Sequence, residues 1–248
     1  MITEAEIRHL GAVSSTNDEA RALIGEVAHP VWCIANEQTK GIGRRGRSWV
    51  SPKGNFYGSL LLPCCDPPDT RALRSFVAAL ALSDALGAAL PGLPISLKWP
   101  NDVLVAGRKI AGILLEGLPD HLIIGIGVNL VTAPSPSSVE ARAVRPVALS
   151  DIGPKVAPDD LADGLARSFA RRDAQFVNYG FDPIRQDWLA HASGLGTEIT
   201  ARLPNREIAG LYETVDEQGA LVLKTPTGRE RITAADIFFS GTDHAACD

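Results

Sequence analysis

Apolar positions recur along the chain at the spacing of amphipathic helices. The apolar face of the first such stretch is formed by Leu73, Phe76, Val77 and Leu80. The run 78–90 continues this stretch, 159–179 shows the same spacing, and 184–191 is a shorter example. We therefore predict a long helix capped by Thr70, a second long helix and a short one, each with one face on a core.

Short apolar runs bounded by turn residues predict strands. The runs that show this pattern are 31–35, 55–62, 95–99, 103–106, 109–116 and 122–128. The last four follow one another too closely for crossover helices, so we predict antiparallel pairing, with a hairpin turn at Ala106-Gly107. The expected fold class is α+β, with a mostly antiparallel sheet and helices on one face.

The beginning of the chain and the segment 131–157 are less regular. No element is predicted over the first 13 residues, whose pattern is mixed. Thr16 and Glu19 have the spacing of a capping box, which predicts a helix from about Asn17 that ends before Pro30. The segment 131–157 is rich in Pro, Ser and Ala and is expected to be a loop.

A change of pattern near Ser193 predicts a second domain. From 194 to 240 apolar and polar residues alternate between turns at intervals of 8 to 12 residues, which is typical of a small barrel or sandwich with four or five strands. We therefore expect two domains, over residues 1–193 and 194–248.

Composition limits the class of protein. The 248 residues are 45% hydrophobic and 21% charged, as in ordinary globular proteins, and a net charge of −5 argues against a protein that coats DNA. The four cysteines lack zinc-ligand spacing and the five histidines are scattered, so we expect no protein metal site. With no signal-peptide pattern and no 18-residue apolar stretch, a cytoplasmic protein with free thiols and no membrane contact is expected.

The segment 41–49 combines three glycines, three arginines and a tryptophan, a composition suited to closing over an anion. Its glycines fit the G-x-G-x-x-G dinucleotide fingerprint, but Pro52 and Gly54 prevent the helix that this motif requires. The P-loop pattern also fails, because Arg47 stands where that motif has lysine. An anion-binding loop of another kind and a solvated basic loop both remain open.

Five motifs occur in order along the chain. They are Ser-Thr-Asn at 15–17, the segment from Gln38 to Trp49, Lys-Trp-Pro-Asn-Asp at 98–102, Arg-Lys-Ile-Ala-Gly-Ile-Leu-Leu-Glu at 108–116, and Gly-Ile-Gly-Val-Asn at 125–129. In this order they resemble the biotin–protein ligase family over about residues 9–130, and 194–240 is similar to its C-terminal domain. The resemblance implies a class II synthetase-like catalytic core and a small SH3-like β-barrel.

The resemblance implies an ATP-dependent enzyme. Such a ligase activates biotin as biotinyl-5′-AMP and then transfers biotin to one lysine of a biotin carboxyl carrier protein or domain. Attack of a carboxylate on the α-phosphorus brings two anions together, so fixed cations are required, and Arg44 and Lys109 are the expected catalytic residues. Mg²⁺ is expected to arrive with ATP and to keep waters.

The same resemblance implies two sets of binding residues. For biotin they are Ser15, Thr16, Asn17, Gln38, Gly41, Ile42, Gly43, Arg44, Lys109 and Gly112. For ATP they are Arg47, Trp49, Lys98, Asn101, Asp102 and Asn129. Other interpretations stay open for some of them: Thr16 as a helix cap, Trp49 as packing in a mobile loop, and Lys109 as a plain surface residue.

The sequence departs from the family pattern in two ways. Ile42 occupies the place of an arginine in the usual Gly-Arg-Gly-Arg-x-Gly-Arg-x-Trp loop, which predicts slower adenylation or looser retention of the intermediate. Only 14 residues precede Ser15, too few for a helix-turn-helix domain, so a monofunctional ligase that does not bind DNA is expected, with a homodimer left open. The alternatives are a lipoate or octanoate protein ligase of the same fold and a non-catalytic biotin-binding regulator.

Overall fold

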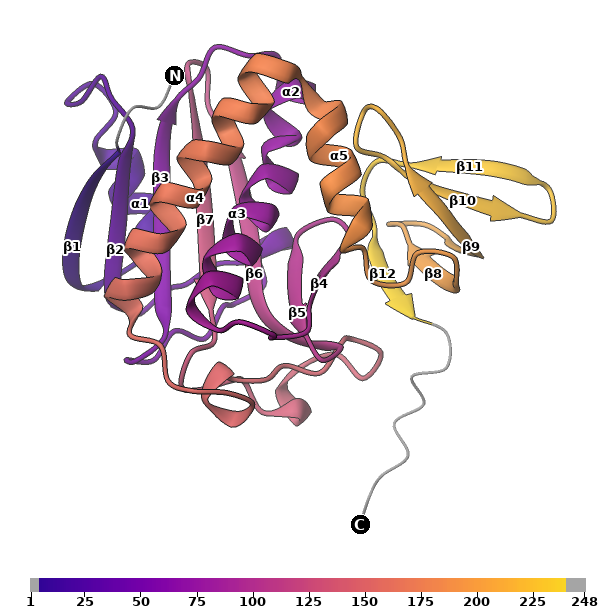
Figure 1. Cartoon of the computed structure of the whole chain (residues 1–248), viewed down its shortest axis with the longest axis horizontal. Coiled ribbons are helices and arrows are strands. Elements are labelled where there is room, and N and C mark those ends of the chain that lie inside the picture. Colours follow the sequence, from indigo (N-terminus) through magenta and orange to yellow (C-terminus); the bar gives the residue numbers. More distant parts are fainter. Residues whose placement is uncertain (1–4, 240–248) are drawn as a thin grey trace.

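A seven-stranded sheet forms the larger part of the molecule in the computed structural model (Figure 1). The structure describes residues 5–239, and within this range it describes Pro136 by its backbone alone. The strand order of the sheet is β1-β2-β3-β7-β6-β5-β4. The strands are β1 Glu6–Val13, β2 Val31–Gln38, β3 Phe56–Pro63, β4 Ile95–Lys98, β5 Asp102–Val105, β6 Arg108–Gly117 and β7 His121–Val128. Only β1 and β2 pair in parallel, so the predicted mostly antiparallel sheet is confirmed.

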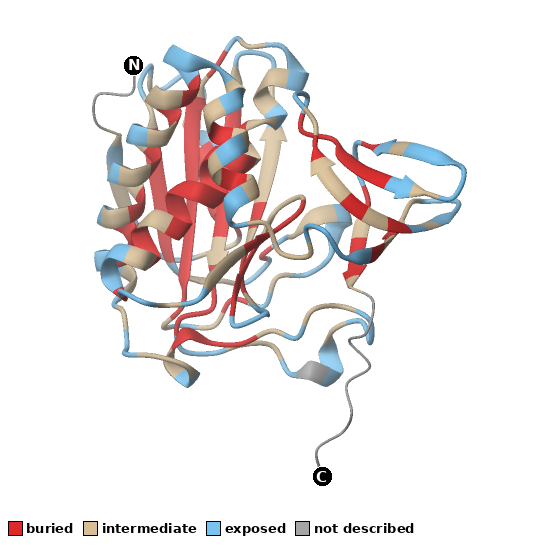
Figure 2. Ribbon diagram, turned by 45° about the vertical axis from the view of Figure 1, so that its right-hand side comes forward, coloured by how far each residue is buried: buried red, intermediate tan, exposed pale blue. Residues whose placement is uncertain are grey.

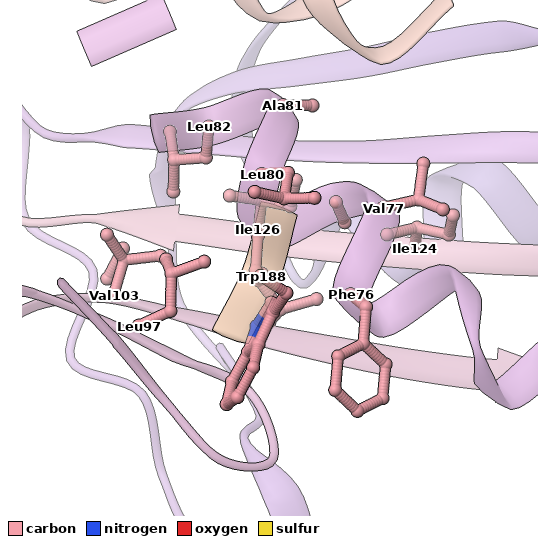
Figure 3. Close-up of a cluster of buried hydrophobic side chains, with 14 of the residues drawn as sticks. Phe76, Val77, Leu80, Ala81, Leu82, Leu97, Val103, Ile124, Ile126 and Trp188 are labelled. Carbon is pink, nitrogen blue, oxygen red and sulfur yellow. The ribbon is translucent and has the colours of Figure 1, made fainter. Parts of the chain in front are cut away.

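Three helices cover one face of this sheet: α3 Arg74–Ala89, α4 Pro158–Tyr179 and α5 Phe181–Ala190 (Figure 1). Their apolar side chains pack on the even-numbered positions of β7, such as Ile124 and Ile126, as Figure 3 shows for α3 and Trp188. Phe76 stands at the centre of an aromatic cluster, with edge contacts to Phe181 and Trp188. Burial of this face, coloured red in Figure 2, supplies most of the hydrophobic stabilisation of the fold.

The opposite face carries α1 Thr16–Ala22, so the expectation that all helices lie on one face is wrong. Ala20 of α1 packs on the odd-numbered side chains of the sheet in a second apolar cluster, with Val31, Cys33, Leu61 and Ile123. Side chains of a strand alternate between faces, so a strand buried on both faces reads as a continuous apolar run and does not reveal on which side each helix lies.

Three local predictions are wrong, one in β1 and two at the N-terminal ends of helices. β1 was not predicted, because its half-buried edge position gives no clear alternation. α1 begins at Thr16 and ends at Ala22, so the predicted helix from about Asn17 that ends before Pro30 is confirmed, and the chain turns after it at Gly25, whose φ is 87°. No capping box forms at Thr16, and Thr70 lies inside a short helix, α2 Pro68–Ala72, instead of capping α3.

The hairpin predicted at Ala106-Gly107 is confirmed between β5 and β6. Both residues have positive φ, 48° and 73°, as the central residues of a type I′ turn require. In the segment 131–157, predicted to be a loop, the structure has only two single 3₁₀ turns, at Pro136–Ser138 and Leu149–Asp151.

The C-terminal part forms a five-stranded antiparallel sheet in the order β11-β10-β9-β8-β12 (Figure 1). Its strands are β8 Glu198–Arg202, β9 Glu207–Val215, β10 Leu221–Thr225, β11 Gly228–Ile232 and β12 Asp236–Phe239. The arrangement resembles a small barrel, but β11 and β12 do not pair within the described residues, so it is not closed. Trp99 donates its indole N–H to the Gly219 carbonyl at 3.0 Å and so ties this sheet to the larger one.

Helices α2 and α3 together, Pro68–Ala89, are long and apolar enough to cross a membrane by length and composition alone, which corrects the expectation from sequence. In the structure 61% of the apolar window is buried inside the protein. Phe76, Val77 and Leu80 face the sheet, so the segment forms part of the core (Figure 3).

Candidate functional site

A cavity of about 610 Å³ opens on the α1 face of the large sheet. It lies between α1, the loop 41–50, the ends of β4 to β7, the segment 134–146 and β12. Of the sixteen residues predicted to bind biotin or ATP, fifteen line it, and Gly41 does not. The sequence motifs, which are up to about a hundred residues apart, are therefore brought together in one place.

Glycines in neighbouring strands make room for the cavity. Gly112 of β6 pairs with Gly127 of β7, and Gly125 pairs with Ser59 of β3. A Cβ atom at Gly125 would lie 2.4 Å from the Asn17 Oδ1, and one at Gly127 would lie 2.4 Å from the Trp49 Nε1. Any larger residue at either position would displace a side chain that lines the cavity.

Neutral hydrogen-bonding groups form one end of the cavity, which we call the neutral end: Thr16, Asn17 and Gln38 line it, and Ser59 is buried behind them. Gln38 Oε1 accepts both the Thr16 N–H at 2.8 Å and the Thr16 hydroxyl at 3.0 Å. Its amide nitrogen donates to Ser51 at 3.0 Å, and Ser51 donates to the Trp49 carbonyl at 2.9 Å. The Thr16 hydroxyl is thus directed to Gln38, so its interpretation as a helix cap is wrong.

Ser59 and Glu116 complete the neutral end from the sheet. The Ser59 hydroxyl lies 2.7 Å from Thr16 Oγ1 and 2.5 Å from Asn17 Oδ1 and is fully buried. On the other side, the Asn17 amide nitrogen donates to Glu116 at 2.5 Å. Glu116 also accepts a hydrogen bond from Arg21 of α1.

The glycine- and arginine-rich loop contains a single 3₁₀ turn, Arg44–Gly46, and no helix follows it. This is consistent with the rejection of both nucleotide motifs. Arg45 has a φ of 58°, in the left-handed region that non-glycine residues rarely adopt. At Gly41 a Cβ would lie 2.4 Å from the Trp49 carbonyl, so this glycine allows the two ends of the loop to approach and does not itself line the cavity.

Cationic side chains gather at the other end of the cavity, which we call the cationic end: Arg44, Lys98 and Lys109. Arg44 donates to Asn101 at 3.2 Å and to the Ala235 carbonyl at 3.5 Å. The Lys109 ammonium lies 2.6 Å from Asp102 and 5.5 Å from the centre of the Trp49 ring. These contacts hold positive charge in a partly enclosed space.

Burial lowers the pKa of two of these groups. Lys98 is only 8% exposed, and desolvation lowers the pKa of its ammonium, against the opposing attraction of Asp102. Burial also lowers the pKa of Arg44, although Asp236 and Asp102 favour its charged form. An anion placed between these groups would replace part of their lost hydration.

The C-terminal sheet contributes Asp236 to the rim of the cavity. Its carboxylate lies 2.5 Å from Arg47, 3.3 Å from Arg45 and 3.2 Å from Arg202. Burial by itself would raise the pKa of Asp236, but hydrogen bonds from Arg202 and Arg47 outweigh it and lower the pKa. Arg47, predicted to bind ATP, is therefore held by a carboxylate of the second sheet.

Two buried polar atoms beside the cavity have no hydrogen-bond partner within the described part of the chain: the Trp49 indole nitrogen and Asn129 Oδ1. Buried polar groups usually have partners, so both atoms are candidates for contacts to a ligand. For Trp49 the half-buried ring fits either of the two interpretations, as a stacking surface or as packing of the loop. Among residues 5–239, no three His, Cys, Asp or Glu side chains cluster as a metal site would require.

Three residues at the site, Ser59, Glu116 and Asp236, were not predicted from the sequence. Ser59 is a polar residue in the middle of the buried strand β3, which was the one signal that could have indicated it. Glu116 closes a motif that was recognised, but its contact with Asn17 joins residues 99 positions apart. For Asp236 no pattern indicated that the second sheet reaches the cavity.

Comparisons with known proteins agree with this arrangement. The family model described as "Biotin/lipoate A/B protein ligase family" matches residues 11–129, and "Biotin protein ligase C terminal domain" matches 194–240. A biotin–[acetyl-CoA-carboxylase] ligase of Paracoccus denitrificans is 47% identical over 94% of this chain and 100% of its own length.

More distant relatives extend the comparison. A bifunctional ligase/repressor of Bacillus subtilis is 31% identical over 95% of this chain and 75% of its own length. The structure of the Aquifex aeolicus biotin protein ligase in complex with biotin and ATP superposes with a TM-score of 0.83 at 27% identity, over 95% of this chain and 99% of that one. The sequence motifs, the fold and these relatives together show that the chain belongs to the biotin–protein ligase family.

Proposed function

We propose that this ligase activates biotin with ATP as biotinyl-5′-AMP and transfers the biotin to a lysine of the biotin carboxyl carrier of acetyl-CoA carboxylase. The Paracoccus relative is named for ligation to that carboxylase, and the Aquifex structure is a complex with biotin and ATP. A cavity of about 610 Å³ is of the size typical for small-molecule sites.

The observation that supports biotin most directly is that the neutral end has one hydrogen-bond donor fewer than its acceptors require. The Thr16 hydroxyl donates its hydrogen bond to Gln38 Oε1, so Thr16 Oγ1 and Asn17 Oδ1 both depend on the single Ser59 proton. One of these two oxygens is therefore free to accept an N–H from a ligand. The ureido ring of biotin carries N–H groups, whereas the dithiolane ring of lipoate carries none.

The cationic end fits the first chemical step. A biotin carboxylate oxygen forms a bond to the α-phosphorus of ATP, and the bond to pyrophosphate breaks. Negative charge develops at the phosphoryl oxygens and the leaving group, where Arg44, Lys98 and Lys109 can stabilise it. Arg44 and Lys109 are already fixed by Asn101 and Asp102, so little reorganisation is required.

In the second step the lysine amine of the carrier attacks the biotinyl carbonyl carbon. The bond from that carbon to the phosphate oxygen breaks, AMP leaves, and the amine loses a proton as the amide forms. The protein contributes mainly positioning, because the mixed anhydride is already reactive.

The same proposal includes Mg²⁺ that arrives with the ATP phosphates, where it would neutralise part of their charge. It also includes a cytoplasmic location, supported by free thiols at Cys33, Cys64 and Cys65, and action without DNA or a membrane. A homodimer is compatible with it and is tested by the mass of the protein in solution.

Biotin-dependent exchange between ATP and pyrophosphate tests the activation step. We expect exchange with biotin and Mg²⁺ and none without biotin, and incubation with a biotin-carrier domain should add one biotin, read by mass. A protein that binds biotin but catalyses no exchange would be a binding module, and exchange with lipoate or octanoate at a rate equal to that with biotin would contradict the proposed specificity.

A further inference from the structure

The side-chain amide of Asn17 lies between two groups of opposite hydrogen-bonding character. Its nitrogen is 2.5 Å from a carboxylate oxygen of Glu116, and its oxygen is 2.5 Å from the hydroxyl of Ser59. A carboxylate oxygen accepts hydrogen bonds, so the amide nitrogen has to face Glu116. The opposite orientation would place two acceptor oxygens together.

The orientation of this amide decides how the neighbouring protons are arranged. With its oxygen toward Ser59, Asn17 competes with Thr16 for the single Ser59 proton, and one acceptor stays open for a ligand. With its nitrogen toward Ser59, Asn17 would donate instead, Ser59 would donate to Thr16, and the open acceptor would disappear. Glu116 therefore determines whether the neutral end accepts or repels an N–H group.

Packing leaves Asn17 few other choices. It is only 7% exposed, and its oxygen lies over Gly125, where a Cβ would approach to 2.4 Å. Arg21, one turn further along α1, donates to the other oxygen of Glu116 and so holds the carboxylate in place. The contact thus runs from an ion pair at the surface to the buried end of the cavity.

We infer that Glu116 is a positioning residue for the ligand, which acts through Asn17 by fixing the orientation of its amide. This inference rests on the proposed function, because it assigns to the neutral end the recognition of the N–H groups of biotin. Glu116 itself does not line the cavity, so its effect on the ligand is indirect. The competing explanation is a purely structural link, in which Glu116 and Arg21 join β6 to α1.

The two explanations differ in what Glu116→Leu changes. If Glu116 orients Asn17, the KM for biotin rises about tenfold, while kcat and the KM for ATP stay within about twofold. Glu116→Gln keeps an acceptor for the Asn17 amide, so its KM for biotin should return to within about threefold of wild type. A structural link would instead lower the melting temperature and change all kinetic constants together.

A double-mutant cycle with Asn17→Ala provides the sharper test. When the Asn17 amide is absent, Glu116→Leu should not raise the KM for biotin further, and calorimetric titration with biotin alone should show the same coupling. Glu213→Leu is the matched control, because Glu213 also lies on a strand, pairs with an arginine and has a side chain 28% exposed, like that of Glu116. This control should leave the KM for biotin unchanged.

The outcomes separate the two proposals. Additive effects of the Asn17 and Glu116 changes, or a Glu116→Leu variant that behaves like Glu213→Leu, would overturn the positioning role while wild-type exchange stays intact. Wild-type protein without biotin-dependent exchange would overturn the proposed function and this inference with it.

Discussion

The two ends of the cavity are built on different principles. At the neutral end, Thr16, Gln38 and Ser59 are uncharged, buried or half-buried, and hydrogen-bonded to one another. At the cationic end, Lys109 is paired with a carboxylate, and Lys98 carries its charge at a cost that shows in its lowered pKa. The neutral end lacks only one hydrogen-bond donor, whereas the cationic end holds positive charge that an anionic ligand would neutralise.

This difference has a physical reason. A small neutral ring is recognised by a few fixed hydrogen bonds. Binding costs least conformational entropy when folding has already ordered the side chains that form these hydrogen bonds. A polyphosphate brings several negative charges, and cations held ready in a partly enclosed site stabilise them more than water does. We therefore expect changes at the cationic end to affect the rate of chemistry and changes at the neutral end to affect binding of biotin.

The largest effect is expected from Lys109→Ala. It removes a cation from the place where charge develops during attack on the α-phosphorus, so biotin-dependent ATP–pyrophosphate exchange should fall at least about 100-fold. Calorimetric binding of biotin without ATP should change much less. Normal formation of the adenylate by this variant would show that the cationic end does not perform the first step.

Asp102→Asn is the matched control for this variant. It removes the partner that lies 2.6 Å from the Lys109 ammonium but keeps the lysine. If the loss in Lys109→Ala came from an unpaired Asp102 carboxylate and not from the missing cation, Asp102→Asn combined with Lys109→Ala would restore exchange.

At both ends the sequence predicted the local motifs better than the contacts between distant strands. The motifs at 15–17, 38–49, 98–102, 108–116 and 125–129 predicted fifteen of the lining residues, because each motif is local and contains unusual residues. Ser59 and Asp236 are single polar residues in otherwise ordinary strands, and their importance arises only when distant strands meet. Hydrophobic periodicity along the chain does not predict contacts between residues that are far apart in the sequence.

The same distinction applies to the fold. Strongly apolar strands such as β3 and β7 were predicted within one residue at each end, since burial on both faces leaves a clear run. Edge strand β1 was missed because its partly exposed positions follow no period. The end of α1 before Pro30 was predicted, and the turn at Gly25, with its positive φ, follows it.

A smaller effect, on binding alone, is expected from Thr16→Val. Valine keeps the shape but removes the hydroxyl that bridges Gln38 and Ser59, so the KM for biotin should rise about tenfold with kcat nearly unchanged. The free energy of unfolding should fall by about 1 kcal/mol. Thr214→Val in the second sheet is the control, and an equal loss of biotin binding there would point to general destabilisation.

Lys98→Met should separate stability from nucleotide binding. Since burial lowers the pKa of Lys98 in the folded state, the charged form opposes folding, and its replacement should raise the free energy of unfolding at neutral pH by about 1 kcal/mol. At the same time the KM for ATP should rise several-fold. A variant that is both less stable and unchanged toward ATP would contradict the assignment of Lys98 to the cationic end.

The pH dependence follows from the same shift. Between the folded pKa and the ordinary lysine pKa of 10.5, the unfolded chain binds more protons than the folded protein at this site, so stability rises with pH in that window. Lys98 loses its charge at a lower pH than an ordinary lysine. As the pH is increased, the KM for ATP of the wild type should therefore start to increase before pH 10.5 is reached. The increase that comes from Lys98 should be absent in Lys98→Met.

The smallest effect is expected from Ile42→Arg, which makes the loop more like that of the family and adds a fourth arginine to 41–49. Ile42 lines the cavity but is 53% exposed, and a charge at such a position is worth only about 0–1 kcal/mol. Release of biotinyl-5′-AMP should slow by no more than about fivefold, and the gain should shrink as salt is raised. Ile42→Gln, which adds polarity without charge, should leave the release rate unchanged. If arginine and glutamine gave equal release rates, the missing cation would not be what distinguishes this loop, and the retention of the intermediate would rest on Arg44 and the contacts of Asp236 with Arg45 and Arg47.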